Sequence, residues 1–180
     1  RFVRIAREEG LALPDDIGEL HALSREIDAV FAKVAPPLVL CHDDVQLANL
    51  IRAEDGRMWV IDWEYGGIGN PYFDLAMLAN NAGLDDAGVG RMLGAYAGAV
   101  RDADRARVEL CRFQAAMREA LWSVVAAPVL ATGWDYDEWA AQFFGIARTV
   151  QESIRSGGLL DRAGPAADDA AMFEGMTRHD

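Results

Sequence analysis

Apolar residues recur every three or four positions through most of the chain, and this periodicity predicts helices. The first clear series lies between Pro14 and Pro36, because Pro14 suits a helix start and Pro36 cannot continue a helix. A second, longer series starts near Asp102 and includes Val124. The remaining predicted helices cover residues 72–80, 86–100 and 135–155.

Short apolar runs between Pro36 and the predicted helix at residues 72–80 indicate strands, because each run is only three or four residues long. They cover residues 38–40, 50–52 and 58–61. Asp55-Gly56 between the last two runs predicts a hairpin turn. Residues 66–69 are expected to be a flexible connection, and residues 160–180 a frayed tail or a short helix. The whole pattern predicts an α+β fold, mostly helical, around a small β-hairpin core.

Length, composition and charge bound the class of protein. With 180 residues, 52% of them hydrophobic, the chain has enough apolar surface for the core of one domain. A formal net charge of −12 argues against nucleic acid as a partner and is compatible with a small cationic ligand. Cys41 and Cys111 fall in a predicted strand and a predicted helix, so we expect free thiols and a cytoplasmic location. No signal peptide or membrane-length apolar run is visible in the sequence, and no membrane partner is expected.

The strongest chemical signal is the segment His42–Asn49, which directly follows the first predicted strand. It contains an aspartate and an asparagine five residues apart, and the next strand ends at Asp62. This arrangement is typical of phosphoryl transfer from ATP, in which one carboxylate accepts the proton of the attacking hydroxyl. An amide and a second carboxylate hold the Mg²⁺ ions that neutralise the phosphates. We therefore predict Asp44 as the catalytic base and Asn49 and Asp62 as metal ligands.

Three neighbouring residues have predicted supporting roles. Glu64 would hold a metal ion or its water, and His42 would brace the loop by hydrogen bonds. The adjacent acids Asp43 and Asp44 raise the question of which is the base. The register to Asn49 selects Asp44 and leaves Asp43 as a turn residue with an Asx-type side-chain bond.

Two tryptophans near this segment are expected to pack inside the molecule. Trp59 alternates along a predicted strand and is most simply a core residue. Trp63 lies between Asp62 and Glu64, so strand alternation predicts that its side chain points away from theirs, into packing. Both expectations treat the hairpin as part of the core.

The chain contains a single lysine, Lys33, on a helical stripe where a solvated charge is expected. Kinases that use this chemistry anchor the nucleotide with a strand lysine and a glycine-rich loop in an N-terminal lobe. Nothing before residue 38 resembles such a loop or a five-stranded sheet. We therefore expect residues 1–180 to form the C-terminal lobe of a kinase-like phosphotransferase. The N-terminal nucleotide lobe would be absent from this chain, which by itself should be inactive.

Several segments resemble the choline/ethanolamine kinase family, within the aminoglycoside phosphotransferase and protein-kinase-like superfamily. Cys41–Asn49 resembles the choline kinase catalytic loop, and Ile61–Tyr65 resembles the I-D-[FW]-E-Y segment of that group. Gly69–Ala76 resembles the following stretch, whose acid, here Asp74, packs behind the site. Two later choline kinase segments are resembled by Leu121–Ser123 and Asp135–Tyr136. The resemblance implies the C-terminal lobe of a protein-kinase-like fold.

The resemblance also implies an aromatic cage for the substrate, in which ring faces attract an ammonium group. The residues carried over into this pocket are Gln46, Tyr65, Trp122 and Tyr136. Glu119 stands where choline kinases often have a further tryptophan, and an acid suits a primary ammonium with hydrogen-bond donors better than trimethylammonium. Trp122 could instead be a core aromatic, and Trp139 is expected to be one.

The implied activity is transfer of the γ-phosphate of ATP, with Mg²⁺, to the hydroxyl of an amino alcohol such as choline or ethanolamine. Two alternatives stay open: an aminoglycoside or other sugar phosphotransferase, and an inactive kinase-like binding module. A broad acidic groove would favour an aminoglycoside, and a compact aromatic cage would favour choline. The joint presence of Asp44, Asn49 and Asp62 argues against the inactive module.

Overall fold

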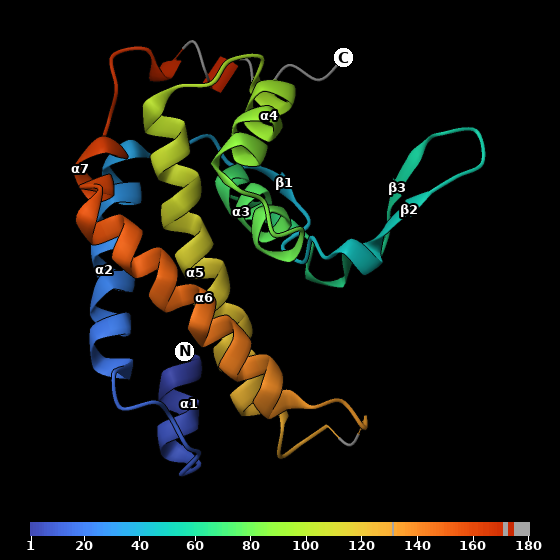
Figure 1. Cartoon of the computed structure of the whole chain (residues 1–180), viewed down its shortest axis with the longest axis vertical. Helices are drawn as coiled ribbons and strands as arrows, with labels where there is room; N and C mark the ends of the chain where they lie inside the picture. Colours follow the sequence, from blue (N-terminus) through green and yellow to red (C-terminus); the bar gives the residue numbers. More distant parts are fainter. Residues whose placement is uncertain (131, 171–172, 175–180) are drawn as a thin grey trace.

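The computed structural model describes residues 1–130, 132–170 and 173–174, and it is mostly helical with two small antiparallel strand pairs (Figure 1). The longer helices are α2 (Ile17–Val34), α3 (Pro71–Asn81), α4 (Asp86–Ala97), α5 (Asp102–Ala126) and α6 (Tyr136–Ser156). Short helices are α1 (Phe2–Glu8), α7 (Leu159–Arg162) and the 3₁₀ turns η1 (Leu47–Asn49) and η2 (Trp63–Tyr65). These elements confirm the predicted fold class.

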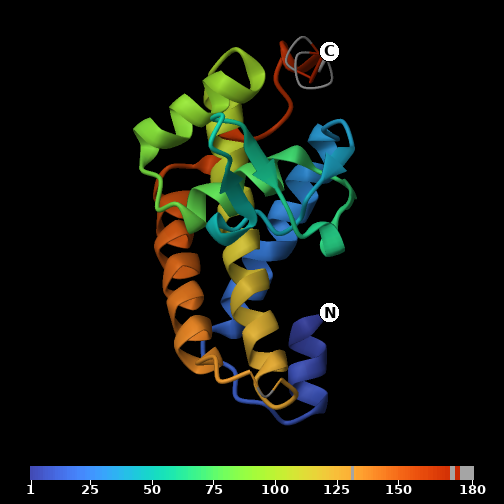
Figure 2. The ribbon, with the colours of Figure 1, turned by 90° about the vertical axis from the view of Figure 1, so that its right-hand side faces the viewer.

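Helix α5 is the central element, and two groups of buried side chains meet on it. The larger group joins α5 to α1, α2, α6 and α7 and includes Leu20, Phe113 and Phe143. The smaller group joins α5 to α3 and α4 and includes Tyr72 and Leu93. Figure 2 shows α2, α5 and α6 running alongside one another. The core therefore lies mainly between helices, and Cys41 on β1 (Val39–Cys41) is the one buried residue among the described strands.

The predicted helices are confirmed with small changes at their ends. Helix α3 begins at Pro71, where the side chain of Asn70 caps it by accepting a hydrogen bond from the Tyr72 amide at 3.1 Å. Helix α4 ends at Ala97, before the predicted residue 100, because Gly98 takes a left-handed conformation with φ 72°. Helix α1 was not predicted, since its seven residues are too few for a clear periodicity.

The β2–β3 hairpin projects from the helical body instead of forming its core (Figure 1). Strands β2 (Leu50–Arg52) and β3 (Met58–Val60) pair in antiparallel register. Trp59 is 53% exposed, so its predicted core position is wrong. Trp63 lies in η2 and is 47% exposed, and its indole N–H donates to the Val60 carbonyl. The alternation argument for Trp63 is wrong because the strand has already ended at Val60.

Strand β4 (Gly67–Gly69) pairs with β1 (Val39–Cys41), so the prediction of a flexible connection is wrong. In this pairing Gly69 lies opposite Val39, and Gly67 lies opposite Cys41. The pairing draws the segment after Asp62 back beside the catalytic loop. The predicted free thiols are confirmed, because Cys41 and Cys111 are buried and unpaired.

The chain after α6 is attached to α5 through a buried arginine. Arg107 has no exposed surface, and its guanidinium donates to the Asp169 carboxylate at 2.7 and 2.9 Å. It also donates to the carbonyls of Ala163 and Gly164 and contacts Asp104. Helix α7 is the short helix expected in this region, while residues 171–172 and 175–180 of the predicted tail lie outside the described residues. Within the described part of the chain, no helix combines the length and apolarity that a membrane crossing requires.

Candidate active site

Helix α3 holds the catalytic loop, which lies between β1 and η1, through hydrogen bonds to one of its side chains. The Asp74 carboxylate, in the first turn of α3, accepts hydrogen bonds from the backbone N–H groups of His42 and Asp43 at 2.7 and 2.8 Å. Asp43 itself has a left-handed backbone with φ 58°, which turns the chain sharply. Burial, reinforced by the nearby Asp74 charge, raises the pKa of Asp43. The turn is therefore held through the backbone of Asp43, while its carboxyl group is left in a poorly solvated position.

His42 connects this loop to the segment after β3. Its ring is buried, and Nδ1 accepts a hydrogen bond from the Asp44 N–H at 3.2 Å. That bond requires the proton to sit on Nε2, which then donates to the Ile61 carbonyl at 2.7 Å. The edge of the ring also faces Trp63, with centroids 4.7 Å apart. His42 thus ties Asp44 to the residue that precedes Asp62.

Two amides hold the carboxylate of Asp44. Gln46 donates to its Oδ1 atom at 3.2 Å, and Asn49 donates to its Oδ2 atom at 3.3 Å and to its carbonyl at 3.0 Å. Asn49 is 9% exposed, and its own carbonyl accepts from the Ile61 N–H. Both oxygens of Asp44 are therefore oriented by neighbouring side chains, and the arrangement can present a fixed acceptor to a substrate hydroxyl.

The predicted metal ligands supply oxygen atoms of the kind that Mg²⁺ prefers. The Asn49 amide points its nitrogen at Asp44, which leaves the Oδ1 atom of Asn49 to act as a metal ligand. Asp62, with φ 65°, and Glu64 are both exposed. No group of three or more Asp, Glu, His or Cys side chains converges within the described residues. This donor set still suits Mg²⁺, which commonly binds one or two carboxylates and completes its shell with water and phosphate oxygens.

The sequence did not reveal Arg118, on α5, which reaches the same loop. Its guanidinium donates to the Asp43 carbonyl and lies 3.7 Å from Oδ1 of Asp44. It also lies 3.8 Å from the Glu119 carboxylate. No local sequence signal marks this position, because the partners Asp43 and Arg118 are 75 residues apart. Arg118 places a positive charge between two carboxylates that were predicted to act on the substrate.

Four of the predicted substrate residues line one small cavity of about 230 Å³. Its walls are formed by Gln46, Glu119, Trp122, Thr132, Trp134, Tyr136 and Trp139. Glu119 is 5% exposed, and burial raises the pKa of its carboxyl group, while Arg118 and a hydrogen bond from Trp139 act in the opposite direction. The rings of Trp122 and Tyr136 lie 5.9 Å apart. The cavity thus combines a buried acid with a wall of aromatic rings.

Trp139 was expected in the core, but it is only partly buried and forms part of this wall. Its ring lies 5.3 Å from Trp134 and 5.0 Å from Phe143. It therefore connects the core to the cavity. Trp134 was not predicted as a pocket residue, and it is 57% exposed at the rim.

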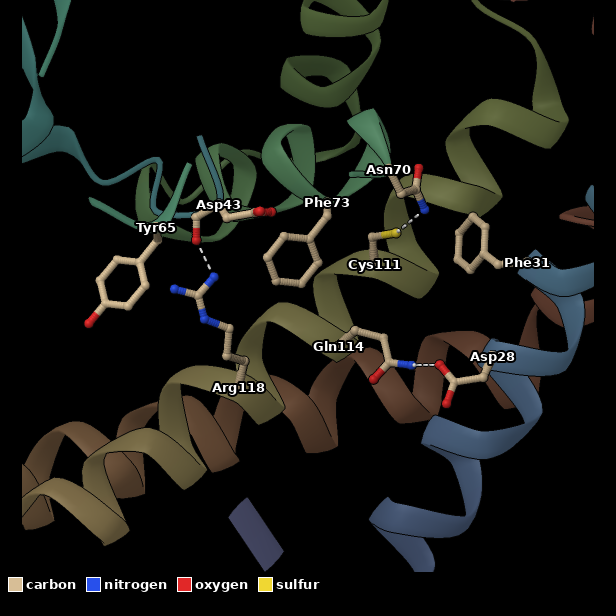
Figure 3. Close-up of a pocket in the computed structure, with 9 residues that line it drawn as sticks. All are labelled: Asp28, Phe31, Asp43, Tyr65, Asn70, Phe73, Cys111, Gln114 and Arg118. Atoms are coloured by element: carbon tan, nitrogen blue, oxygen red, sulfur yellow. Dashed lines mark hydrogen bonds between the residues drawn. The ribbon is translucent and has the colours of Figure 1, made fainter. Parts of the chain in front are cut away.

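Tyr65 lies in a second, larger cavity of about 580 Å³, and it is not among the residues that line the small one. Figure 3 shows this cavity, with Tyr65 and Arg118 at one end and Phe31 and Asp28 at the other. Phe73 forms the wall between these ends. Tyr65 therefore lines a different cavity from the other predicted cage residues, although the Arg118 guanidinium lies near both Tyr65 and Glu119.

Comparisons with known proteins identify the family and the fold. A family model described as "Phosphotransferase enzyme family" matches residues 2–111. A choline/ethanolamine kinase family protein from Mesorhizobium loti is similar in structure, with a TM-score of 0.82 and 22% identity, over 90% of this chain and 56% of that one. Choline kinase LicA from Streptococcus pneumoniae has a TM-score of 0.67 and 20% identity, over 79% of this chain and 50% of that one.

Among curated proteins, Protein LicA of Haemophilus influenzae is 32% identical over 68 residues, which is 37% of this chain and 20% of that protein. The chain spans about half the length of the two solved structures named above. The structural likeness confirms the predicted kinase-like fold, and the matched region includes the whole catalytic loop.

Proposed function

Because the chain belongs to the phosphotransferase enzyme family, we propose that it is the acceptor-binding lobe of a small-molecule kinase. The reaction would transfer the γ-phosphate of ATP to the hydroxyl of an amino alcohol such as ethanolamine or choline. One observation carries this proposal: the buried carboxylate of Glu119 shares a small cavity with the rings of Trp122 and Tyr136. A carboxylate and aromatic faces both attract an ammonium group.

The acceptor hydroxyl would lie against Asp44, because Gln46 belongs to the cavity wall and also donates to Oδ1 of Asp44. Asp44 would accept the hydroxyl proton while the two amides keep its carboxylate in position. Asn49, Asp62 and Glu64 would hold Mg²⁺. When bound, Mg²⁺ and ATP supply the phosphoryl group and the neutralisation of its charge. What this chain itself provides is the positioned base and the pocket for the ammonium end.

We also propose that the nucleotide is held by a further lobe of a longer protein. Lys33, the only lysine of the chain, is exposed on α2. The chain aligns with only about half of each of the two solved structures described above. Kinases of this kind position the phosphates from an N-terminal lobe. Activity assays should therefore use the longer protein, and binding assays can use this chain.

The direct test is Asp44→Ala in the longer protein, assayed for ATP-dependent phosphorylation of ethanolamine and choline. We expect kcat to fall by about 10²–10⁴-fold, the range for loss of a positioned base, with KM much less affected. Asp55→Ala is the matched control, because Asp55 is an exposed acid that pairs with Arg57 at the hairpin turn. Turnover within a few-fold of the unmodified protein would remove Asp44 from the role of base.

The substrate class is tested at the buried acid. Glu119→Gln should weaken the use of ethanolamine more than that of choline, because only a primary ammonium donates hydrogen bonds to the carboxylate. An aminoglycoside phosphotransferase would instead prefer kanamycin over both small alcohols. An inactive binding module would bind ethanolamine but phosphorylate none of these compounds.

A further inference from the structure

One residue from the wall of each cavity lies close to the same oxygen of Asp44. Gln46, in the wall of the 230 Å³ cavity, donates to Oδ1 of Asp44 at 3.2 Å. Arg118, in the wall of the 580 Å³ cavity, places Nη2 at 3.7 Å from that oxygen. Arg118 lines the larger cavity and its Nε atom also lies 3.8 Å from the carboxylate of Glu119, which lines the smaller one, so its side chain adjoins both cavities.

Arg118 is held firmly in this position. Its guanidinium carbon lies 5.4 Å from the ring centre of Tyr65 and 5.6 Å from that of Phe73. It also donates to the Asp43 carbonyl, and its side chain is 25% exposed (Figure 3). A guanidinium that is flanked by two rings and bonded to the backbone loses little freedom when it acts as a wall.

The larger cavity has the chemistry for a bulky ligand that carries amines. Phe31 and Phe73 offer apolar surface, while the carboxylates of Asp28 and Asp43 lie toward opposite ends (Figure 3). Gln114 donates to Asp28 at 3.0 Å and adds a further polar group. The volume of the larger cavity falls within the range of about 300–1,000 Å³ that is usual for ligand sites, and the volume of the smaller cavity falls below that range.

We propose that Arg118 is a specificity-determining residue, which confines the acceptor to the small aromatic cavity and closes the larger cavity to it. With the Arg118 side chain shortened, the two cavities would join. Amine-bearing alcohols of one or more sugar rings could then occupy the larger cavity while placing an ammonium group beside Glu119. This inference rests on the proposed function, because it takes the small cavity as the acceptor site.

Intrinsic fluorescence can test the proposal without catalysis. Three tryptophans, Trp122, Trp134 and Trp139, line the small cavity, and none is among the described residues that line the large one. Ethanolamine, glucosamine and kanamycin would be titrated separately into the chain and into its Arg118→Ala variant. Arg148→Ala is the matched control, since Arg148 forms a partly exposed ion pair with Asp16.

We expect ethanolamine to change the tryptophan signal of the unmodified chain, and kanamycin to change it little. In Arg118→Ala the kanamycin response should appear at concentrations at least about tenfold lower, and Arg148→Ala should behave as the unmodified chain. Glucosamine should show an intermediate gain. If Arg118→Ala does not fold, Arg118→Lys, which keeps the charge but loses the planar fork, should still give a smaller gain for kanamycin.

Two results would overturn the inference. One is a kanamycin response that is unchanged in a folded Arg118 variant, and the other is a response of the unmodified chain to kanamycin as strong as its response to ethanolamine. The proposed function fails in a different way, through the absence of any ethanolamine response in the unmodified chain. A gain for kanamycin together with no ethanolamine response would keep the partition and remove the amino-alcohol assignment.

Discussion

Helix α5 and the β2–β3 hairpin differ in how far their side chains are buried. On α5 even an arginine is completely buried, because Asp104, Asp169 and two carbonyls satisfy Arg107. On the hairpin, Trp59 is 53% exposed although tryptophan is strongly apolar. The helical body is therefore complete in itself, while the hairpin offers apolar surface that the described chain does not cover. The catalytic loop lies at the boundary of the two regions, and four mutations would break or sharpen the contrast.

The largest effect on stability is expected from Arg107→Met. The change leaves the partly buried Asp169 carboxylate without its main partner and removes the ion pair with the fully buried Asp104, and breaking a buried ion pair costs about 3–5 kcal/mol. Urea unfolding of the chain would measure the loss. Arg155→Met is the control, because Arg155 pairs with Glu26 at the surface and should cost below about 1 kcal/mol. Equal losses in the two variants would mean that the body does not depend on the buried network.

The next effect concerns the pocket end of α5. Trp122→Ala should raise KM for a cationic acceptor more than it lowers kcat, because a ring in contact with an ammonium contributes about 0.5–2 kcal/mol. That range corresponds to a rise in KM of about 2–30-fold in the longer protein. Trp59→Ala is the paired control on the hairpin and should leave KM for the acceptor unchanged. If kcat fell and KM did not, Trp122 would be positioning the loop rather than binding the acceptor.

The pH dependence of stability gives a smaller, directional signal. Burial raises the pKa of Glu119, so this group contributes stability below its unfolded pKa and loses it as the pH rises through the folded pKa. Stability of Glu119→Gln relative to the unmodified chain should therefore improve between about pH 4 and about pH 7. Unfolding curves at both pH values would show it. A difference that is constant with pH would mean that the carboxyl group is solvated.

The smallest effect is expected on the hairpin. Trp59→Ala should change the free energy of unfolding of the chain by less than about 1 kcal/mol, because the indole is 53% exposed and the Arg57 guanidinium lies 5.6 Å from its ring centre at the surface. Thermal or urea unfolding would measure it. A loss of several kcal/mol would show that the hairpin is covered in solution, for example by a second molecule.

The helices could be predicted because their signals are local. Each long helix carries its own apolar periodicity and its own end signals, such as Pro71 at the start of α3 and Gly98 after α4. The hairpin shows the limit of this reasoning. Its pairing was predictable from Asp55-Gly56, but the exposure of Trp59 depends on what packs against the pair, which alternation along a strand does not encode.

The site divides in the same way. Asp44 and Asn49 could be found because one continuous segment carries both, and Gln46, Glu119 and Tyr136 came from resemblance and share a cavity in the structure. The long-range contacts of the site could not be predicted from the sequence. The contact of Arg118 with Asp43 joins residues 75 positions apart, and which cavity Tyr65 lines also depends on side chains distant in the sequence, such as Phe31 and Arg118.

The hydrogen bonds from His42 and Asp43 to Asp74 have a consequence for local unfolding. Amides in a loop normally exchange with solvent quickly, but these two are bonded to a side chain within the first turn of α3. Their exchange would then follow the opening of α3, which packs on α5, and not the opening of the exposed hairpin. The bonds to Asp74 thus couple the exchange of the catalytic loop to the helical body, while His42 and Asn49 connect the same loop to Ile61 at the base of the hairpin.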